Sequence, residues 1–141
     1  MEKIKVIEGG IFIDHRGKLS HVNELDMTEI ERFYIIYHDK TETIRAWHAH
    51  QHEKKWFYCI KGSFTTAFVK IDNWDNPSLN LKPEVYILSA NHSQIICIPE
   101  GYANGIKANE PDSILLVLSN KTLENAVHDS WRYDADMWMK W

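Results

Sequence analysis

The hydrophobic positions of this chain fall in short runs that favour β-strands. Val, Ile, Tyr, Phe and Trp are frequent in these runs, and turn-forming Asp, Asn, Gly, Pro and Ser separate them. The expected strands are 4–13, 18–22, 32–38, 43–50, 55–60, 63–71, 84–88, 94–98, 102–108 and 113–119. Short strands at this spacing predict an antiparallel sandwich or barrel, in which each strand has one core-facing row and one outer row of side chains.

Helical signals are few. Residues 26–32 form one short candidate, with Thr28 as its candidate N-cap, and residues 123–129 form another. The sequence contains no internal repeat and no Pro/Gly-rich linker, so residues 1–141 are expected to form a single all-β domain. A domain of this size can bury a core without a metal or disulfide staple.

Charge and composition narrow the choice of partners. The net charge is -4 and both signs are mixed along the chain, which argues against a nucleic-acid surface. No apolar run approaches 18 residues and the first residues lack a signal core, so we expect no membrane association and a cytoplasmic location. Cys59 and Cys97 lie in apolar runs and are expected to be small buried hydrophobes, with a disulfide between them left open.

Two histidines stand together in one expected strand. His48 and His50 are two residues apart, so their side chains share a face of the strand. Such a pair can hold a metal, act as an acid/base pair, or be two exposed imidazoles. Apolar strands precede and follow the pair, which favours an interior position.

The pair resembles the first cupin motif, in which two histidines are followed by a glutamate and a glycine. The corresponding residues here are His48, His50, Glu53 and Gly62, with the glutamate one position early and the glycine late. The second cupin motif, Pro-x-Gly-x-x-His, resembles Pro99-Glu100-Gly101-Tyr102-Ala103-Asn104. A carboxamide is a poorer ligand for a transition metal than an imidazole. We therefore expect acid–base chemistry without a metal.

Six motifs follow one another along most of the chain. They are Asp14-x-Arg16-Gly17-x-Leu19, Arg45-Ala46-Trp47-His48, Asp72-x-x-x-Asn76-Pro77-Ser78, Leu88-Ser89-Ala90, Ile98-Pro99-Glu100-Gly101-Tyr102-Ala103-Asn104-Gly105 and Trp131-Arg132-Tyr133-Asp134-x-x-x-Trp138. In this order they resemble the dTDP-4-dehydrorhamnose 3,5-epimerase family. Residues 47–50, Trp-His-Ala-His, also resemble the TDP-4-oxo-6-deoxyhexose 3,4-ketoisomerases. The resemblance implies a jelly-roll cupin (a double-stranded β-helix sandwich) and a homodimer. It also implies a nucleotide-diphosphate sugar as substrate and no cofactor.

The resemblance also implies roles for individual residues. His48, with His50 beside it, matches the base that removes a proton next to the keto group, a role that suits an imidazole near neutral pH. Arg16 and Arg45 match residues that hold the diphosphate or the sugar, and Lys55 matches a cation near the developing enolate. Tyr102 and Asn104 belong to the matching second motif and are assigned to substrate binding. Strict alternation puts Arg45 on the face opposite His48, so its role requires a twist or bulge; the alternative for Arg45 and for Lys55 is a solvated surface charge.

Three features depart from the 3,5-epimerase pattern. Leu116 stands at the position of the proton-donating tyrosine, Asn104 at that of the second-motif histidine, and the C-terminal segment that carries an orienting aspartate is not seen. Another tyrosine is then needed as the acid; the candidates are Tyr34, Tyr37, Tyr58, Tyr86 and Tyr102.

The favoured function is an epimerase acting at C3, with C5 left open, on a dTDP-4-keto-6-deoxyhexose in surface-polysaccharide biosynthesis. The alternatives are a 3,4-ketoisomerase on the same substrate class, a non-catalytic sugar-binding cupin, and a metal-dependent dioxygenase-type cupin.

The remaining histidines and the tryptophans are expected to be structural. The histidines expected to face solvent are His15, His21, His38, His92 and His128. Trp47, Trp56 and Trp74 are expected to pack the sandwich or a dimer interface because each buries a large area. The C-terminal tryptophans 131, 138 and 141 are expected to dock against a partner subunit.

Overall fold

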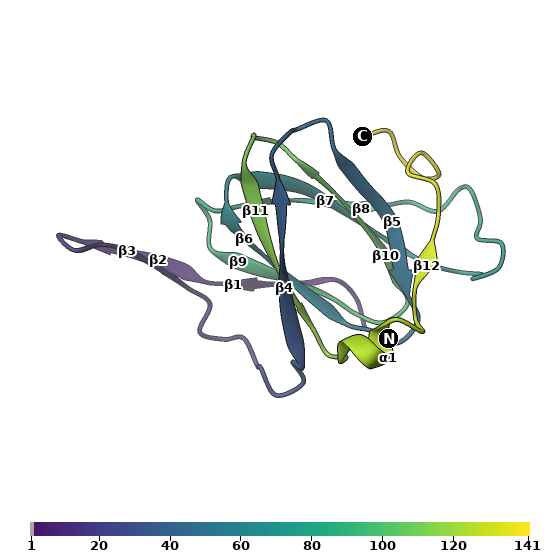
Figure 1. The fold of residues 1–141 in the computed structure, drawn as a ribbon, viewed down its shortest axis with the longest axis horizontal. Coiled ribbons are helices and arrows are strands. Elements are labelled where there is room, and N and C mark those ends of the chain that lie inside the picture. The colour runs from purple at the N-terminus through teal and green to yellow at the C-terminus, as the bar shows by residue number, and fades with distance from the viewer. Residues whose placement is uncertain (1) are drawn as a thin grey trace.

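The computed structural model describes residues 2–141, and its regular secondary structure consists of antiparallel strands and one short helix (Figure 1). The elements are β1 (Lys5–Glu8), β2 (Gly10–Asp14), β3 (Gly17–His21), β4 (Arg32–His38), β5 (Ile44–His50), β6 (Lys55–Lys61), β7 (Ser63–Lys70), β8 (Glu84–Ser89), β9 (Gln94–Ile98), β10 (Tyr102–Ala108), β11 (Ser113–Ser119), α1 (Leu123–Ala126) and β12 (Trp131–Arg132). The expected strands are confirmed, except that the run 4–13 divides into β1 and β2.

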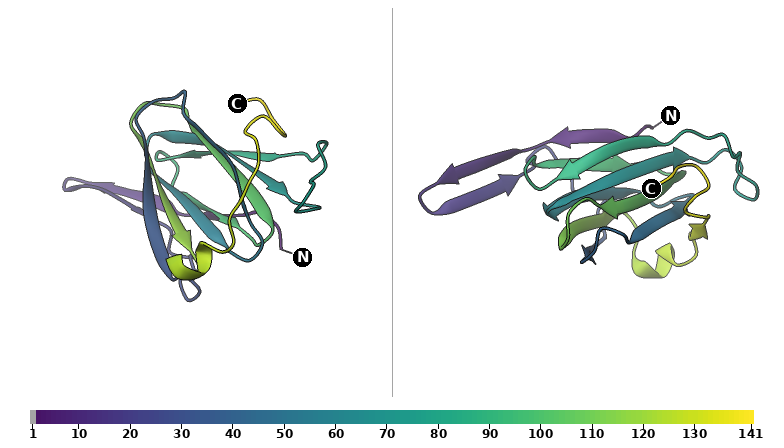
Figure 2. Two further views of the ribbon diagram at one scale, coloured as in Figure 1. Left: turned by 45° about the vertical axis from the view of Figure 1, so that its right-hand side comes forward. Right: turned by 90° about the horizontal axis from the view of Figure 1, so that it is seen from above.

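The strands form two facing sheets and a separate hairpin. One sheet has the order β1-β9-β6-β11-β4, the other has the order β12-β5-β10-β7-β8, and β2 pairs only with β3. This is the expected jelly-roll sandwich. The hairpin β2–β3 extends away from the sandwich (Figure 2). No helix among residues 2–141 is long and apolar enough to cross a membrane.

The prediction of a helix over residues 26–32 is wrong. Residues 27–30 form a turn, in which the backbone N–H of Ile30 donates to the carbonyl of Met27 at 3.1 Å. The Asp26 carboxylate accepts the backbone N–H of Thr28 at 3.0 Å, which favours this turn over a helical one. The backbone N–H of Glu31 then donates to the carbonyl of Ser119 at 2.8 Å, which leads the chain into β4. The second expected helix is present but shorter, as α1, and its N-cap is Thr122.

Two hydrophobic clusters hold the sandwich together. The first lies between the sheets and includes Phe57, Phe64, Phe68 and Leu115. The second covers the outer face of β5 and β10, where residues 131–141 pack over Trp47. The ring centroids of Trp138 and Trp141 each lie 5.4 Å from that of Trp47. The C-terminal tryptophans thus dock on their own chain, where a partner subunit was expected.

His38 is also placed differently from expectation. It ends β4 and is 2% exposed, against the expectation of a solvent-facing residue. The inward row of β4 consists of Arg32, Tyr34, Ile36 and His38, because alternate residues of a strand face the same side. This row faces the space between the sheets.

The two cysteines, Cys59 and Cys97, are free thiols, so no disulfide joins them.

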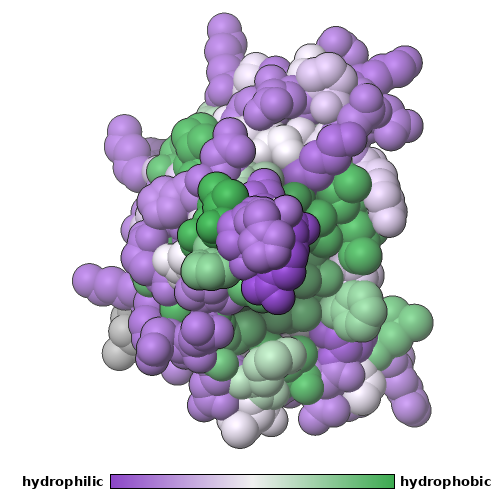
Figure 3. Space-filling view, turned by 90° about the vertical axis from the view of Figure 1, so that its left-hand side faces the viewer, coloured by the Kyte–Doolittle hydropathy of each residue, from purple (hydrophilic) through white to green (hydrophobic). Residues whose placement is uncertain are grey.

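The outer row of β4 is apolar and exposed. Phe33, Ile35 and Tyr37 are 65%, 38% and 63% exposed. The next strand continues the apolar surface, with Leu116 of β11 paired beside Ile35. From the side on which the hairpin projects, Figure 3 shows apolar residues gathered beside and below a polar protrusion. A patch of this kind on a small protein commonly marks an interaction surface.

Candidate active site

A β-bulge in β5 brings Arg45 and His48 to the same side of the strand. Asn104 of β10 pairs with His48, while Ile106 pairs with Arg45, so three steps on β5 oppose two on β10. The extra residue shifts the alternation of side chains by one position. Arg45 and His48 therefore both line a cavity of about 500 Å³ between the sheets. The bulge that the role of Arg45 requires is present.

The lining of this cavity is cationic. Arg45, Lys55 and Arg132 contribute three positive charges, and no Asp or Glu lines it. Apolar side chains of both sheets, including Ile36 and Val117, form much of the remaining wall. Clustered positive charge against low-dielectric walls concentrates the field and attracts an anionic ligand. The two arginines in particular match the geometry of phosphate oxygens.

A smaller cavity adjoins the first and contains the second histidine. Its volume is about 220 Å³ and it shares Tyr34, His48 and Lys55 with the larger one. His50 and Glu53 line only the smaller cavity. The imidazole centroids of His48 and His50 lie 4.3 Å apart, so the two rings are in contact.

The hydrogen bonds of His50 fix its tautomer. Its Nδ1 lies 2.7 Å from the carbonyl oxygen of Asp129 and 3.2 Å from Oε1 of Glu53. Both partners are acceptors, so Nδ1 carries the hydrogen in the neutral ring. Nε2 then presents its lone pair, and it is buried without a hydrogen-bond partner among residues 2–141.

His48 is held by the residue that follows Asp129. Its Nε2 lies 2.8 Å from Oγ of Ser130. The backbone of His48 also pairs with Arg132 of β12. The segment 129–132 therefore fixes both imidazoles from one side.

Both imidazoles are neutral in the unliganded protein. Burial lowers the pKa of His48 to about 3, the charges of Lys55 and Arg132 lower it further, and Glu53 opposes these effects. Burial also lowers the pKa of His50 to about 4, and the charge of Lys55 adds to this effect. A neutral imidazole is the form that can accept a proton.

Asp129 and Glu53 organise the turn after β5. The Asp129 carboxylate accepts the backbone N–H groups of Gln51, His52 and Glu53 at 2.7, 2.8 and 2.9 Å. The Glu53 side chain is 1% exposed, and Arg32 and Ser119 donate to its carboxylate. The three bonds of Asp129 join segments 76 to 78 residues apart in the chain. No signal in the sequence pointed to the roles of Asp129 and Ser130.

Tyr34 is the tyrosine that reaches the cavities. Of the five candidate tyrosines it alone lines both cavities, and its hydroxyl accepts a hydrogen bond from Lys55 Nζ at 2.9 Å. Lys55 is 5% exposed, so it is not a solvated surface charge. Tyr34 and Lys55 belong to one sheet and His48 to the other, so the phenol and the imidazole face each other across the cavity.

The structure brings together some of the expected site residues and separates others. Asn104 lines the larger cavity beside His48. Tyr102 does not line either cavity; it is 6% exposed and packs in the core between the sheets. Arg16 lies near the tip of the hairpin, with its side chain 76% exposed and paired with Asp14 at 2.7 Å. Leu116 is on the outer face of β11, and Val117 takes the cavity-facing position.

The donor set does not fit a metal ion. Within residues 2–141 no three His, Cys, Asp or Glu side chains are arranged to bind one.

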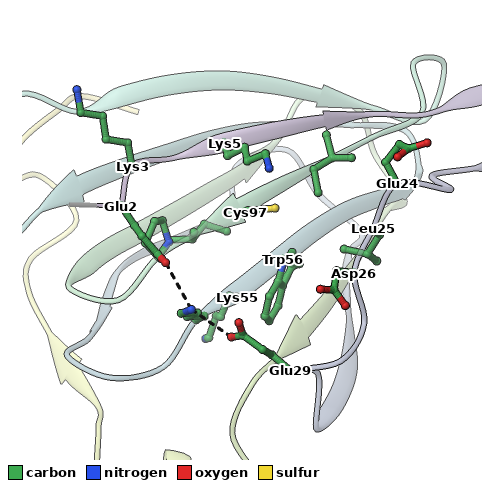
Figure 4. Close-up of a pocket in the computed structure, with 14 residues that line it drawn as sticks. Glu2, Lys3, Lys5, Glu24, Leu25, Asp26, Glu29, Lys55, Trp56 and Cys97 are labelled. Carbon is green, nitrogen blue, oxygen red and sulfur yellow. Dashed lines mark hydrogen bonds and ion pairs between the residues drawn. The ribbon is translucent and has the colours of Figure 1, made fainter.

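A further cavity of about 430 Å³ lies on the outer face of the first sheet (Figure 4). Trp56 and Cys97 contribute to its lining, and Lys54 pairs with Glu2 at 3.7 Å and Glu29 at 3.1 Å at its edge. Charges of both signs surround it and no histidine lines it. We therefore place the candidate active site in the cavities that contain His48.

Comparison with known proteins agrees with this architecture. Residues 2–136 match the family model described as FdtA: WxcM-like, C-terminal. The QdtA 3,4-ketoisomerase from Thermoanaerobacterium thermosaccharolyticum, in complex with TDP, superimposes with a TM-score of 0.72 at 19% identity, over 94% of this chain and 89% of that one. The WlaRB TDP-quinovose 3,4-ketoisomerase from Campylobacter jejuni gives 0.68 at 20% identity, over 99% and 93%.

The rmlC epimerase of Mycobacterium tuberculosis gives a TM-score of 0.79 at 17% identity, over 98% of this chain and 74% of that one. No curated protein matches the sequence. The likeness to all three structures confirms the jelly-roll cupin fold.

Proposed function

The chain belongs to the FdtA family of WxcM-like C-terminal domains, and we propose that it is an isomerase of a nucleotide-linked 4-keto-6-deoxy sugar. The observation that carries this proposal is the pairing of a cationic cavity with two neutral imidazoles. Arg45, Lys55 and Arg132 suit a diphosphate, and His48 suits proton removal from carbon. Solved cupins of this fold include a ketoisomerase in complex with TDP.

His48 is the proposed base. In the tautomer whose Nε2–H donates to Ser130 Oγ, the lone pair on Nδ1 takes the proton from the carbon next to the ketone. The electrons of the broken C–H bond form a double bond to the carbonyl carbon, and the π electrons of the C=O bond move to the ketone oxygen, which gains negative charge. Tyr34 and Lys55 lie on the facing sheet, where a hydroxyl and an ammonium stabilise that oxygen.

A 3,4-ketoisomerase is the outcome that the geometry supports best. The C3 proton leaves to His48 and returns to C4 on the same side, while the proton of the 3-hydroxyl moves to O4, so that the carbonyl ends at C3. This path needs proton carriers on one side of the sugar, and His48 and His50 are adjacent on one strand.

Epimerisation at C3 is the second candidate, and one observation favours it. Inversion needs an acid on the side opposite the base, and Tyr34 faces His48 from the other sheet. β11 contains no tyrosine that could supply this proton. Val117 lines the cavity there, and Leu116 faces outward.

Incubation with TDP-4-keto-6-deoxyglucose labelled with ¹³C at C3 and C4 separates the two outcomes. A ketoisomerase moves the carbonyl resonance from C4 to C3. A C3 epimerase keeps it at C4, inverts C3, and introduces deuterium there in D₂O. Tight binding of TDP with neither change would identify a non-catalytic sugar-binding cupin and refute the enzyme proposal.

We further propose that the functional unit is a homodimer. The outer face of the first sheet has five strands of four to seven residues, about 4.8 Å apart, which gives roughly 480 Å². A standard interface buries about 800 Å² on each partner. The hairpin, on which Phe12, Ile13 and Leu19 are exposed, supplies additional apolar area. Contact of Arg16 with a substrate would then involve the second copy.

Sedimentation tests the dimer. We expect a dimer at about 10 µM, and a monomer for the double variant Phe33→Lys/Tyr37→Lys, because two charges would be buried unpaired in the interface. Val85→Lys, on the equally exposed edge strand β8 of the other sheet, is the matched control and should remain dimeric. A monomeric wild type would refute this assembly.

A further inference from the structure

His38 contacts the arginine of the cationic cavity from within the core. Arg45 Nε donates to His38 Nε2 at 3.0 Å. The imidazole packs edge-on against Phe64, with 5.6 Å between the ring centroids, and its backbone pairs with Ser113 of β11. His38 itself does not line the cavity.

This hydrogen bond fixes the state of the imidazole. A guanidinium only donates, so Nε2 of His38 must be the acceptor and the ring is neutral with its hydrogen on Nδ1. That Nδ1 is buried and has no hydrogen-bond partner among residues 2–141. Burial lowers the pKa of His38 and the Arg45 charge lowers it further, while Asp39 opposes both effects.

The bond to His38 uses only Nε of Arg45 and leaves the two Nη groups available for a ligand. Within residues 2–141 no acceptor binds its two Nη groups, and the side chain lines the cavity. A free arginine side chain has many rotamers, and ordering them on ligand binding costs free energy. Fixing Nε in advance orients the plane of the guanidinium before the ligand arrives.

We propose that His38 is a positioning residue: it holds Arg45 in the orientation that binds the anionic group of the ligand. The proposal rests on the proposed function in so far as that ligand is a nucleoside diphosphate sugar. A purely structural role does not explain the choice of residue. A buried unpaired N–H costs about 1–3 kcal/mol, and an apolar residue of similar size would avoid this cost.

The test compares four variants with the wild type by calorimetric titration with TDP. Arg45→Met removes the guanidinium, and His38→Leu removes its acceptor. His38→Gln places an amide oxygen near the position of Nε2, whereas His38→Asn places it near Nδ1, out of reach of Arg45. We expect about tenfold weaker binding for His38→Leu and His38→Asn, and binding within about twofold of wild type for His38→Gln.

A double-mutant cycle distinguishes positioning from general damage. In the Arg45→Met background, His38→Leu should cause no further loss of affinity, because the residue it acts through is gone. Additive losses, or wild-type affinity of His38→Leu, would overturn the proposal. Thermal unfolding should show His38→Leu at least as stable as wild type; if that variant does not fold, the comparison of His38→Gln with His38→Asn decides the question.

A ligand-free measurement separates this proposal from the proposed function. Long-range ¹H–¹⁵N NMR should show His38 neutral with hydrogen on Nδ1, and its Nε2 resonance should shift in Arg45→Met. A hydrogen on Nε2 of His38 would overturn the positioning role even if TDP binds. If the NMR result holds but wild type does not bind TDP, the proposed function fails and His38 still orients Arg45.

Discussion

Replacing Asp129 with asparagine should weaken both the fold and the active site. The carboxylate is 7% exposed and accepts three backbone N–H groups at 2.7–2.9 Å, one on Oδ1 and two on Oδ2. An asparagine can place its oxygen at the Oδ2 position and keep two of these bonds. Its NH₂ group then faces the backbone N–H of Gln51, so two donors meet and one acceptor is lost.

The cost follows from these contacts. A hydrogen bond to a charged group contributes about 1.5–3 kcal/mol, and the two retained bonds lose their charge assistance. We therefore expect a loss of about 3 kcal/mol, a large part of the roughly 5–15 kcal/mol that stabilises a domain. For a chain of this length the loss corresponds to a lowering of Tm by about 6–12 °C.

Urea unfolding at pH 7 measures the loss, with Asp26→Asn as the matched control. Asp26 also accepts a backbone N–H, that of Thr28 at 3.0 Å, but in an exposed turn, so its variant should stay within about 0.5 kcal/mol of wild type. Because the carbonyl of Asp129 holds His50, turnover by Asp129→Asn should also fall at a temperature where the variant is folded. A free energy of unfolding equal to that of Asp26→Asn would refute the reasoning.

Three further outcomes are expected. The folded-state pKa of His50, about 4, is below its unfolded value of about 6.5, so the unfolded state binds more protons in between and stability is lost as the pH falls through that range. His50 should contribute about 2 kcal/mol of this loss between pH 7 and 5. In urea unfolding, the free energy of unfolding of His50→Gln should therefore depend less steeply on pH than that of wild type; an unchanged pH dependence would contradict the lowered pKa of His50. Lys55→Met should keep or raise Tm because a buried ammonium is removed, yet lower kcat about 100-fold or more, and retained turnover would exclude Lys55 from the chemistry. Gly105→Ala should destabilise by about 1–3 kcal/mol, since a Cβ there would lie 2.5 Å from Cζ2 of Trp141, and Trp141→Ala should relieve much of the loss in thermal unfolding.

The sandwich could be predicted from the sequence because its strands are encoded locally. Runs such as 113–119 combine β-branched residues with flanking turn formers, and the structure confirms them. Residues 26–32 were wrongly expected to be helical because helix propensity competes there with a single side-chain-to-backbone bond of Asp26. No periodic pattern reveals that competition.

The candidate site could be predicted only in part. His48 and His50 are two residues apart, so their common face followed from strand geometry alone. The placement of Arg45 beside them depends on a bulge against β10, which single-strand alternation does not reveal. Asp129 and Ser130 reach the imidazoles from about 80 residues away, and Tyr102 of the matching motif turned into the core instead. Contacts of this kind depend on tertiary packing.

Removal of a carbon-bound proton by His48 is the central claim, and solvent exchange tests it most directly. The measurement is deuterium incorporation at C3 and C4 of TDP-4-keto-6-deoxyglucose in D₂O, followed by NMR for wild type, His48→Asn and His52→Asn. His52 is exposed and lines neither cavity, so it provides a matched control four residues along the chain. If His48 is the base, we expect exchange by wild type and His52→Asn, and a rate at least about 100-fold lower for His48→Asn. Exchange by His48→Asn at the wild-type rate would contradict this role.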